Sequence, residues 1–544
     1  MTLIQHRFNQ SGLSSIDMGQ DTYGYFFLIH TTRLSHFCDK IEHESKRGMI
    51  MKRSAGILYP IFSLSSRYGI GCFSKEAYEF IDFLKKAGQT YWQILPIHPT
   101  GFGDSPYQPV SAFAGNPYFI SLEDLIQDGL LTEQECNSYD FGHDVERINY
   151  GTLYNYRQDL LKQAFVRFQP DDAYEKFLKD ASYWLKDYAL YMVIKQQQEG
   201  KSWNDWPLEA RMRKPSYLKQ IETENKKLMH FYYFQQYEFA KQWQKLLTYA
   251  HSQEIQIIGD IPFYCAMDSS DVWAHPEIFW MDEDYLPKYV AGTLPDAFSP
   301  TGQRWGNPVY DWTALKKTKY DWWMKRMQHA QKWFDVVRID HFHGFSEYCA
   351  IPYEEETAEN GIAKKGPGLD FFNVLKQVCP DIEIIAEDLG TNTPEKEKLL
   401  KDTGFPGMNV LQFAFTGWNH DSYYLTHNHK RNSVVYTGTH DNPTTLEWFE
   451  TLNEGDRIFA SKYIHTDPNN PGQFVWDFIR EAYRSVANLT IVSLSDYLVK
   501  GKEARINTPG TSQGNWQWRL VPHFLSDELA YSIRDLTETY GRLQ

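Results

Sequence analysis

The sequence predicts an α/β protein built on a (β/α)8 TIM barrel, with inserted, largely helical subdomains over the C-terminal face of the barrel. Eight short apolar runs rich in β-branched residues are bounded by turn residues, which is typical of buried strands. Amphipathic helical patterns stand between most of these runs, and a repeated strand–helix alternation indicates a parallel sheet. Eight such units are the number that a (β/α)8 barrel requires.

The predicted strands begin near Ile57, Tyr91, Ile255, Phe334, Ile382, Met408, Ser433 and Leu489. Helical periodicity is clearest over 75–87, where apolar residues recur on one face, and over 321–333, just before the fourth strand. After the fifth strand, Thr393-Pro394-Glu395 supplies an N-cap, a first-turn proline and an acid near the positive helix end. The alternation therefore continues through the middle of the chain.

Two intervals between strands are much longer than the roughly 30 residues of one barrel unit. The first predicts an insertion at 99–252, which opens with a Gly/Pro-rich segment and then becomes helical, so we expect a helical lid subdomain. The second predicts a substrate-loop insertion at 264–332, containing VAGTLPDAFSPTGQRWGNP. Since loops that follow barrel strands lie on the C-terminal face, we expect both insertions to wall one cleft there.

The first 48 residues have weak periodicity and no place in this scheme, so the predicted catalytic barrel covers 49–544. Met49 and Met51 stand directly before the first predicted strand. One hypothesis is that the working chain starts at one of these methionines and that the leader 1–48 is dispensable. An equally active and stable chain that starts at Met49 would support this hypothesis, and loss of folding would contradict it.

The composition excludes some partners. A net charge of -15 and a pI of about 5.7 argue against nucleic acid, because phosphate-backbone binders need clustered Lys and Arg. The 17 Trp and 36 Tyr offer flat rings with a polar edge, which suit sugar rings, although we expect most of them to lie in the core. A neutral or cationic substrate is therefore favoured.

The six cysteines show no CxxC or metal-type spacing, which is typical of scattered reduced thiols and predicts a cytoplasmic protein. No apolar stretch approaches the roughly 20 residues of a membrane helix, so no membrane partner is expected. No signal peptide is recognisable near the start of the sequence.

Three carboxylates, Asp340, Glu387 and Asp441, each follow a short apolar run that is typical of a buried strand: FDVVRID, IEIIAE and SVVYTGTHD. A carboxylate is costly to bury without a partner. One such residue in an ordinary chain would most often belong to a surface salt bridge. Three of them at the ends of the fourth, fifth and seventh predicted strands indicate a site.

These acids could break and remake glycosidic bonds. Arg338 shares a strand face with Asp340 and should lower its pKa, which favours Asp340 as the nucleophile. Burial and the like charge of Asp340 should raise the pKa of Glu387 and make it the acid. Double displacement needs such a pair and retains configuration when the carboxyl groups lie about 5–5.5 Å apart. Asp441, with His440 beside it, could orient hydroxyls and stabilise positive charge.

A metal site is the competing interpretation, with His341, His343 and His440 as ligands beside the carboxylates. A His-x-His pair alone is weak support, and neither a metal nor a cofactor is expected, because carboxylates alone serve this chemistry. No GxGxxG, Walker loop or GxSxG stands in a suitable setting, which argues against nucleotide-binding and serine-hydrolase functions.

From about residue 54 to its C-terminus the chain resembles the amylomaltases, the 4-α-glucanotransferases or disproportionating enzymes of glycoside hydrolase family 77, which are related to the α-amylase barrels. The motifs that carry the resemblance occur in the expected order: FGDSPYQPVSAFAGNPYFISL (102–122), LPDAFSPTGQRWGNPVYDW (294–312), VVRIDHF (336–342), IAEDLG (385–390), GTHDN (438–442) and NTPGTSQGNWQWR (507–519).

The resemblance implies roles for the site residues. It makes Asp340 the nucleophile, Glu387 the acid/base and Asp441 the transition-state stabiliser, with Arg338 and His440 beside them. It also implies substrate-binding residues in the lid loop 290–306 and around it, namely Asp296, Gln303, Trp305, Asn307 and His341, with Tyr107 on the donor side. The chain departs from the family pattern at His343, where an arginine is usual, and at Ser346 and Cys349, and all three positions follow the nucleophile.

The function that the resemblance implies is retaining 4-α-glucan transfer from donor to acceptor maltodextrins through a covalent glycosyl-enzyme. Its partners would be malto-oligosaccharides and other α-1,4-glucans, in cytoplasmic maltodextrin or glycogen metabolism, with the enzyme a monomer or a homodimer. Two alternatives stay open. An α-amylase-like hydrolase would use the same acids with water, although the long lid with Trp305 favours transfer. A catalytically inactive maltodextrin-binding protein is disfavoured by the presence of all three acids.

Overall fold

The computed structural model describes residues 51–101, 103–295, 299–390, 393–522 and 524–544. The predicted leader at 1–48 therefore lies outside the described residues. Lys52–Gln544 form one compact unit, and the account below concerns this unit.

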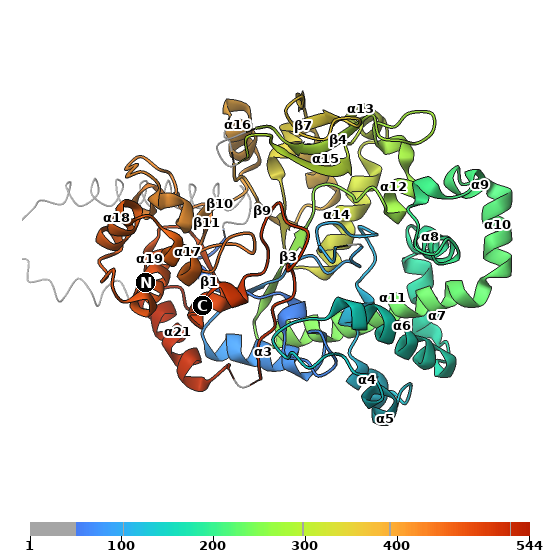
Figure 1. The fold of residues 1–544 in the computed structure, drawn as a ribbon, viewed down its shortest axis with the longest axis horizontal. Helices are drawn as coiled ribbons and strands as arrows, with labels where there is room; N and C mark the ends of the chain where they lie inside the picture. The colour runs from blue at the N-terminus through green and yellow to red at the C-terminus, as the bar shows by residue number, and fades with distance from the viewer. Residues whose placement is uncertain (1–50, 102, 296–298, 391–392, 523) are drawn as a thin grey trace, which may run out of the picture. The chain divides into compact units, whose positions relative to one another are not determined.

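Eight parallel strands form the centre of this unit, in the spatial order β10-β11-β12-β1-β2-β3-β6-β9 (Figure 1). Every one of the eight predicted strands is confirmed. Their bounds are β1 Ser54–Leu58, β2 Tyr91–Gln93, β3 Gln256–Ile261, β6 Val336–Ile339, β9 Glu383–Ala386, β10 Gly407–Val410, β11 Ser433–Tyr436 and β12 Leu489–Ser493.

The sheet closes on itself. β1 pairs with both β2 and β12, so the first and last barrel strands of the chain are neighbours. Between β9 and β10 the Ala386 N–H donates to the Pro406 carbonyl at 3.0 Å, and the Asp388 carboxylate accepts from the Met408 N–H at 2.7 Å. These bonds join the two outer strands of the sheet order, and the fold is the predicted (β/α)8 barrel.

Helices cover the outside of the barrel, as the strand–helix alternation predicts. Thr393 caps α16 through its side chain, and Gly404 ends that helix in the left-handed conformation that favours glycine. The outer helices are α3 Lys75–Lys86, α14 Asp321–Trp333, α15 Leu369–Val378, α16 Pro394–Thr403, α17 Thr445–Thr451, α18 Glu454–Ile464, α19 Pro471–Arg484, α20 Leu494–Tyr497 and α21 Asp527–Thr539.

Between β2 and β3 the chain is mainly helical and extends to one side of the barrel (Figure 1). The long helix α11 contacts α3, α8 and β3, and so ties this segment to the barrel. The helices are α4 Leu122–Gln127, α5 Glu133–Asn137, α6 Tyr150–Arg167, α7 Asp172–Asp180, α8 Leu185–Gln197, α9 Leu208–Arg211, α10 Pro215–Glu224 and α11 Lys226–Ser252. In the described part of the chain no helix combines the length and apolarity needed to cross a membrane.

A second, antiparallel sheet was not predicted. Its order is β5-β4-β7-β8, with bounds β4 Tyr289–Thr293, β5 Gln303–Pro308, β7 Glu347–Pro352 and β8 Ile362–Lys365. β4 and β5 lie within the segment 264–332, together with α12 Ser270–Ala274 and α13 Trp312–Lys317, whereas β7 and β8 follow Asp340. Part of the segment expected to be a loop is therefore a sheet. The sequence does not reveal it because β5 is polar and only partly buried, and β8 is largely exposed.

Candidate active site

Three acids lie beyond the carboxyl ends of barrel strands, at the face where such barrels carry their active sites. Asp340 directly follows β6, Glu387 directly follows β9, and Asp441 lies in the loop after β11. The fractional exposures of the Asp340 and Asp441 side chains, 30% and 48%, leave both within reach of a substrate.

Asp340 and Glu387 stand side by side because β6 and β9 pair in register. Ile339 pairs with Ala386, so the next residue of each strand begins about one strand spacing, roughly 4.8 Å, from the other. The Glu387 N–H donates to the Ile339 carbonyl at 3.1 Å, and the Asp340 N–H donates to Ile261 of β3 at the same distance. The backbone therefore fixes the two carboxyl groups as neighbours.

Arg338 links the nucleophile candidate to a buried acid on the adjoining strand. Its Nη1 lies 2.8 and 2.7 Å from the two carboxylate oxygens of Asp260, and 3.1 Å from Oδ1 of Asp340. Arg338 and Asp260 are both buried, and such a pair is held in place because breaking it would leave a buried charge. The guanidinium therefore presents a fixed positive charge to Asp340.

Glu387 has the environment of a proton-holding carboxyl group. Burial, and after it the charge of Asp340, raise the pKa of Glu387 to about 8. Arg338 and two backbone N–H donors act in the opposite direction: His341 donates to Oε2 at 2.7 Å and Leu389 to Oε1 at 2.8 Å. At neutral pH, Glu387 can therefore donate a proton.

Asp441 is held from two sides. The Asn507 amide donates to its Oδ1 at 2.7 Å, and Nε2 of His440 lies 3.3 Å from the same oxygen. The Asn507 N–H also donates to the His440 carbonyl at 3.1 Å, so the two loops are joined by backbone as well. The carboxylate is thereby oriented while it stays open to solvent.

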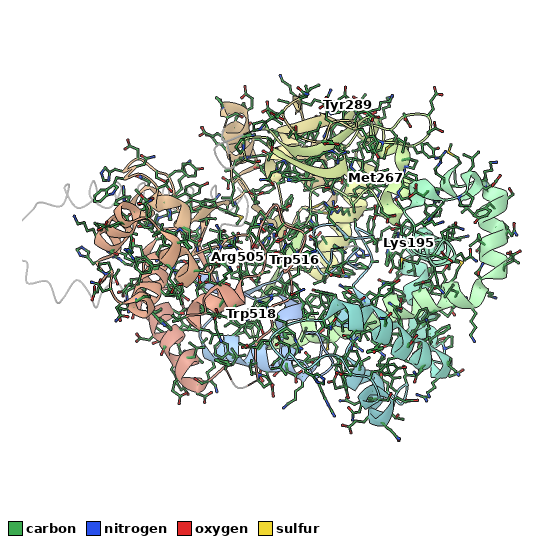
Figure 2. The ribbon with its side chains drawn as sticks, in the orientation of Figure 1. Lys195, Met267, Tyr289, Arg505, Trp516 and Trp518 are labelled. Carbon is green, nitrogen blue, oxygen red and sulfur yellow. The ribbon has the colours of Figure 1, made fainter. Side chains whose placement is uncertain are left out.

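Tyr107 connects these groups across the barrel mouth. Its hydroxyl donates to Oδ2 of Asp260 at 2.7 Å, and its ring stacks on His440 with centroids 4.9 Å apart and an interplanar angle of 11°. Trp516 packs at 5.9 Å from Tyr107 and 6.0 Å from His440, and Figure 2 labels it near the middle of the molecule. An aromatic wall therefore stands next to the acids.

A second aromatic group borders the site from the small sheet. Trp305 meets His341 edge to face at 5.1 Å, and Tyr264 lies 6.3 Å from Trp305 and 6.1 Å from His341. The Trp305 indole donates to Gln303 Oε1 at 3.1 Å. Trp305, Gln303 and His341 thus belong to one cluster adjoining Asp340.

Asn307 makes its contacts within the protein. It exchanges two amide hydrogen bonds with Gln108, at 2.8 and 3.1 Å, and donates to the Cys265 carbonyl at 2.9 Å. These bonds tie the segment after Tyr107 to β5. Asp296 lies outside the described residues, so its expected contact with a glucan stays a prediction.

Sequence reasoning missed three residues of this site: Asp260, Asn507 and Trp516. Asp260 could have been found, because it is a carboxylate inside the apolar run IQIIGDIPF and the burial argument used for the other acids applies to it. Asn507 and Trp516 lie in NTPGTSQGNWQWR (507–519), a motif of the family resemblance, and that motif could have directed attention to both.

The metal interpretation gains no support. Among the residues that the structure describes, no group of three or more His, Cys, Asp and Glu side chains is arranged to hold a metal ion. Burial lowers the pKa of His341 to about 4 and that of His343 to about 3, so at neutral pH neither ring adds a positive charge next to Asp340.

A (β/α)8 barrel with paired carboxyl groups at the ends of adjacent strands has the architecture of an enzyme acting on glycosidic bonds. The sequence model of the family described as 4-alpha-glucanotransferase matches residues 59–524. The chain belongs to this 4-α-glucanotransferase family, and both the resemblance inferred from the motifs and the enzyme class that it implies are confirmed.

Individual relatives agree. A 4-alpha-glucanotransferase from Clostridium butyricum is 46% identical over 488 residues, covering 89% of this chain and 100% of the relative. One from Thermus thermophilus is 42% identical over 506 residues, covering 91% and 100%. Among solved structures, an amylomaltase from Streptococcus agalactiae in complex with acarbose superimposes with a TM-score of 0.88 at 38% identity, covering 91% of this chain and 100% of that one.

Proposed function

We propose that Asp340, Glu387 and Asp441 transfer α-1,4-glucan segments between maltodextrins by double displacement. In the first half, a carboxylate oxygen of Asp340 attacks the anomeric carbon of the donor. The glycosidic C–O bond breaks, and Glu387 gives its proton to the leaving 4-oxygen. The glucan is then held as an ester of Asp340.

In the second half, the acceptor's 4-hydroxyl replaces the departed chain. Glu387, now ionised, takes the hydroxyl proton while the acceptor oxygen attacks the anomeric carbon and releases the Asp340 carboxylate. Each displacement inverts the anomeric centre, so the product retains the donor's configuration. Glu387 ends the cycle protonated, and the enzyme is regenerated without any cofactor.

One observation carries this assignment: the register that makes Asp340 and Glu387 neighbours while their surroundings differ. Adjacent strands in register bring the two side chains to neighbouring positions, which the retaining mechanism requires. Arg338 faces Asp340 at 3.1 Å, whereas Glu387 has a raised pKa. One group is therefore suited to attack and the other to proton transfer.

Asp441, His440 and Tyr107 are proposed to bind the sugar at the reacting centre. The exposed carboxylate of Asp441 can accept from ring hydroxyls and stabilise positive charge as the bond breaks. The stacked Tyr107 and His440 rings form a firm edge for the donor sugar. Their position beside Asp260 ties this edge to the Arg338 network.

Transfer rather than hydrolysis is favoured by the cluster of Trp305, Tyr264 and His341. An aromatic surface beside the nucleophile can bind the acceptor sugar and exclude water from the glycosyl-enzyme. Gln303, Asn307 and Asp296 are proposed to complete the acceptor and lid contacts.

The proposed setting is cytoplasmic maltodextrin or glycogen metabolism, with the enzyme as a monomer or homodimer. The five cysteines in the described part of the chain are unpaired and buried, which accords with a reducing compartment. We also propose that 49–544 suffices for activity, because the family match begins at residue 59.

The deciding experiment is incubation of the purified protein with maltotriose, following free glucose, reducing ends and chain length, with Asp340→Asn as the control. A ladder of longer maltodextrins with glucose but no net gain of reducing ends, absent in the variant, is the expected result. Rising reducing ends without longer chains would instead establish a hydrolase. No change in chain length, despite maltodextrin binding, would establish a binding protein.

A further inference from the structure

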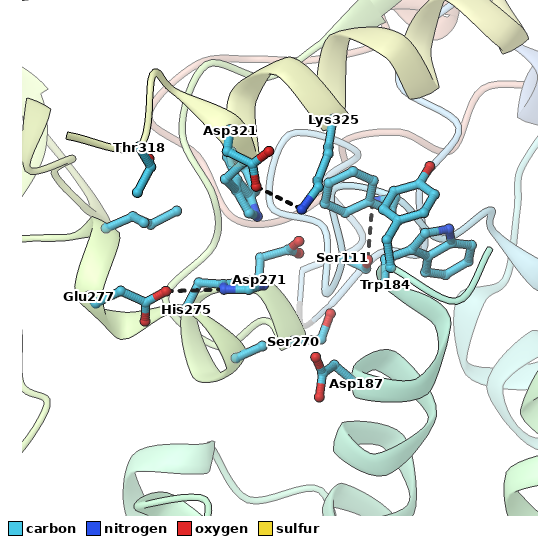
Figure 3. Close-up of a pocket in the computed structure, with 15 residues that line it drawn as sticks. Ser111, Trp184, Asp187, Ser270, Asp271, His275, Glu277, Thr318, Asp321 and Lys325 are labelled. Atoms are coloured by element: carbon cyan, nitrogen blue, oxygen red, sulfur yellow. Dashed lines mark hydrogen bonds and ion pairs between the residues drawn. The ribbon is translucent and has the colours of Figure 1, made fainter. Parts of the chain in front are cut away.

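A second pocket lies between helices α8, α12 and α14 and shares no lining residue with the active site (Figure 3). Its volume is about 220 Å³. Pockets for drug-sized ligands measure about 300–1,000 Å³, so this one suits a single small ring or two. The residues that line it come from segments far apart in sequence, beginning at Ser111 and ending at Lys325.

Aromatic side chains make one wall of the pocket. Phe113 is central: it stacks on Trp184 at 6.4 Å and meets Tyr183 and Trp322 edge to face at 5.7 and 5.8 Å. His329 adjoins this group, and its Nδ1 lies 2.7 Å from the Tyr183 hydroxyl. The wall is therefore a rigid apolar surface of the kind that accepts the face of a sugar ring.

The remaining lining residues are mostly polar, and their carboxylates already have partners. Asp321 binds Lys325 at 2.7 Å, and Nδ1 of His275 lies 3.2 Å from Glu277. Asp271 accepts from the Ala112 N–H at 2.7 Å. Because these carboxylates are not a free cluster, a metal ion gains little here, whereas a neutral ligand with several hydroxyls can share their remaining lone pairs.

Two donors of the aromatic wall lack an acceptor. The indole N–H groups of Trp184 and Trp322 are buried and have no hydrogen-bond partner within the described ranges. A buried donor left unpaired costs about 1–3 kcal/mol. A ligand hydroxyl that reaches either N–H group would supply the missing partner.

We propose that this pocket binds a glucose unit of an α-1,4-glucan, as a second carbohydrate site separate from the active site. The inference rests on the proposed function, which makes such glucans the available ligand. Apolar rings and partnered polar groups line one cavity of one or two ring sizes, which matches the amphipathic surface of a pyranose.

The pocket is joined to the active site through one loop. Ser111 lines the pocket, and Tyr107, four positions earlier, bonds to Asp260. The same loop is fastened at Ala112 by Asp271, and the Ser270 N–H donates to the Val110 carbonyl at 2.8 Å. Occupation of the pocket would therefore stabilise the loop that carries the donor-side tyrosine.

The test is a calorimetric titration of the Asp340→Asn enzyme with maltotetraose, which this variant cannot turn over. Two binding events are expected. Adding Ala274→Trp, which fills the pocket from α12, should abolish the binding event at the pocket. Adding Trp305→Ala should weaken the binding event at the active site. Ala173→Trp, on the exposed face of α7, is the matched control and should leave both. Circular dichroism and the melting temperature establish that each variant is folded.

The outcomes separate this inference from the proposed function. A single event, weakened by Trp305→Ala and untouched by Ala274→Trp, would overturn the second site and leave the function standing. Two events that both survive a folded Ala274→Trp would also overturn it. Should Ala274→Trp not fold, Lys325→Ala with Lys332→Ala as control replaces it, and unchanged binding in both would overturn the site. No binding of maltotetraose at all would overturn both proposals.

The second site also predicts a kinetic difference. In the enzyme with Asp340 intact, Ala274→Trp should raise the KM for long amylose severalfold, because a second contact on one polymer increases its effective concentration. Turnover of maltotriose should be unchanged. Equal effects on both substrates, or none on either, would contradict the role of the pocket in holding long chains.

Discussion

The guanidinium of Arg338 lies between two carboxylates, 2.7 Å from Asp260 and 3.1 Å from Asp340, and Asp260 is the fully buried partner. Arg338 therefore makes its shorter ion pair with a residue that no substrate reaches. The arrangement fixes the guanidinium so that Asp340 meets a charge that does not move. It also makes Asp260 a positioning residue for the whole site.

Asp260→Asn should impair catalysis and stability together. It removes one half of a buried ion pair, for which a cost of about 3–5 kcal/mol is typical, and frees the Tyr107 hydroxyl from a charged acceptor. We expect kcat to fall by at least about tenfold, corresponding to about 1.4 kcal/mol of the barrier, with a smaller change in KM.

Steady-state kinetics and thermal melting check this prediction. Asp335→Asn is the matched control, because Asp335 stands just before β6, at the end opposite to the site, where it contacts His251 at 2.8 Å. That variant should keep kcat. Wild-type kcat in a folded Asp260→Asn enzyme would show that Arg338 needs no second carboxylate.

The pH dependence of transfer should report Glu387. Since its pKa is raised to about 8, the acid keeps its proton at neutral pH and loses it as the pH rises through that value. We expect kcat/KM for maltotriose to fall on the basic side with an apparent pKa of about 8. A basic limb near the ordinary glutamate value would mean that another group supplies the proton.

Ionisation of Glu387 should also destabilise the folded state at high pH. Its pKa rises from 4.5 to about 8 on folding, so the folded state holds the proton more tightly. The penalty is absent below about pH 4.5, grows as the pH rises, and is complete above about pH 8. The melting temperature of Glu387→Gln, relative to wild type, should therefore rise across this window, while exposed Glu356→Gln should show no such trend.

The barrel could be predicted because its strands are largely apolar on both faces. IIGDI and VVRI each carry only one charged residue, Asp260 and Arg338, in an otherwise apolar run that is typical of a buried parallel strand. The small sheet could not, since β5 (QRWGNP) and β8 (IAKK) are polar and gain their partners only from tertiary pairing with β4 and β7.

The site residues likewise divide into those that an apolar strand marks in the sequence and those that only the tertiary fold brings into the site. Asp340 and Glu387 were predictable because an ionisable group directly after an apolar strand contradicts burial unless it has a function. Asn507, which fixes Asp441, begins a motif of the family resemblance, but only the fold, in which the chain returns over the barrel, brings it to Asp441. No spacing in the sequence encodes that return.

Trp305→Ala should shift the products from transfer toward hydrolysis. The ring is the part of the small sheet that meets His341, the residue after the nucleophile, at 5.1 Å. Without it, water reaches the glycosyl-enzyme more easily and an acceptor sugar loses a stacking partner. We expect the ratio of new reducing ends to longer maltodextrins to rise severalfold. Trp418→Ala, at an exposed ring after β10, is the control, and equal ratios in the two variants would contradict the role of Trp305.

Arg542→Ala should destabilise the barrel without altering its chemistry. The buried guanidinium donates to the carbonyls of Ser54, Tyr483 and Ser485 at 3.0, 3.0 and 2.9 Å, and so ties the C-terminal end of the chain to the start of β1 and to the end of α19. Burial, with the nearby charge of Arg53, lowers the pKa of Arg542 to about 9, which offsets part of the gain from these bonds.

Hydrogen bonds to a charged group contribute about 1.5–3 kcal/mol each, so after this offset we expect a net loss of about 2–4 kcal/mol. The melting temperature should fall by a few degrees, while kcat at low temperature stays at the wild-type value. Arg534→Ala is the matched control, since this exposed residue of α21 pairs only with Glu538 among the described residues. A melting temperature of Arg542→Ala equal to that of Arg534→Ala would mean that burial of the guanidinium costs as much free energy as its hydrogen bonds to carbonyls provide.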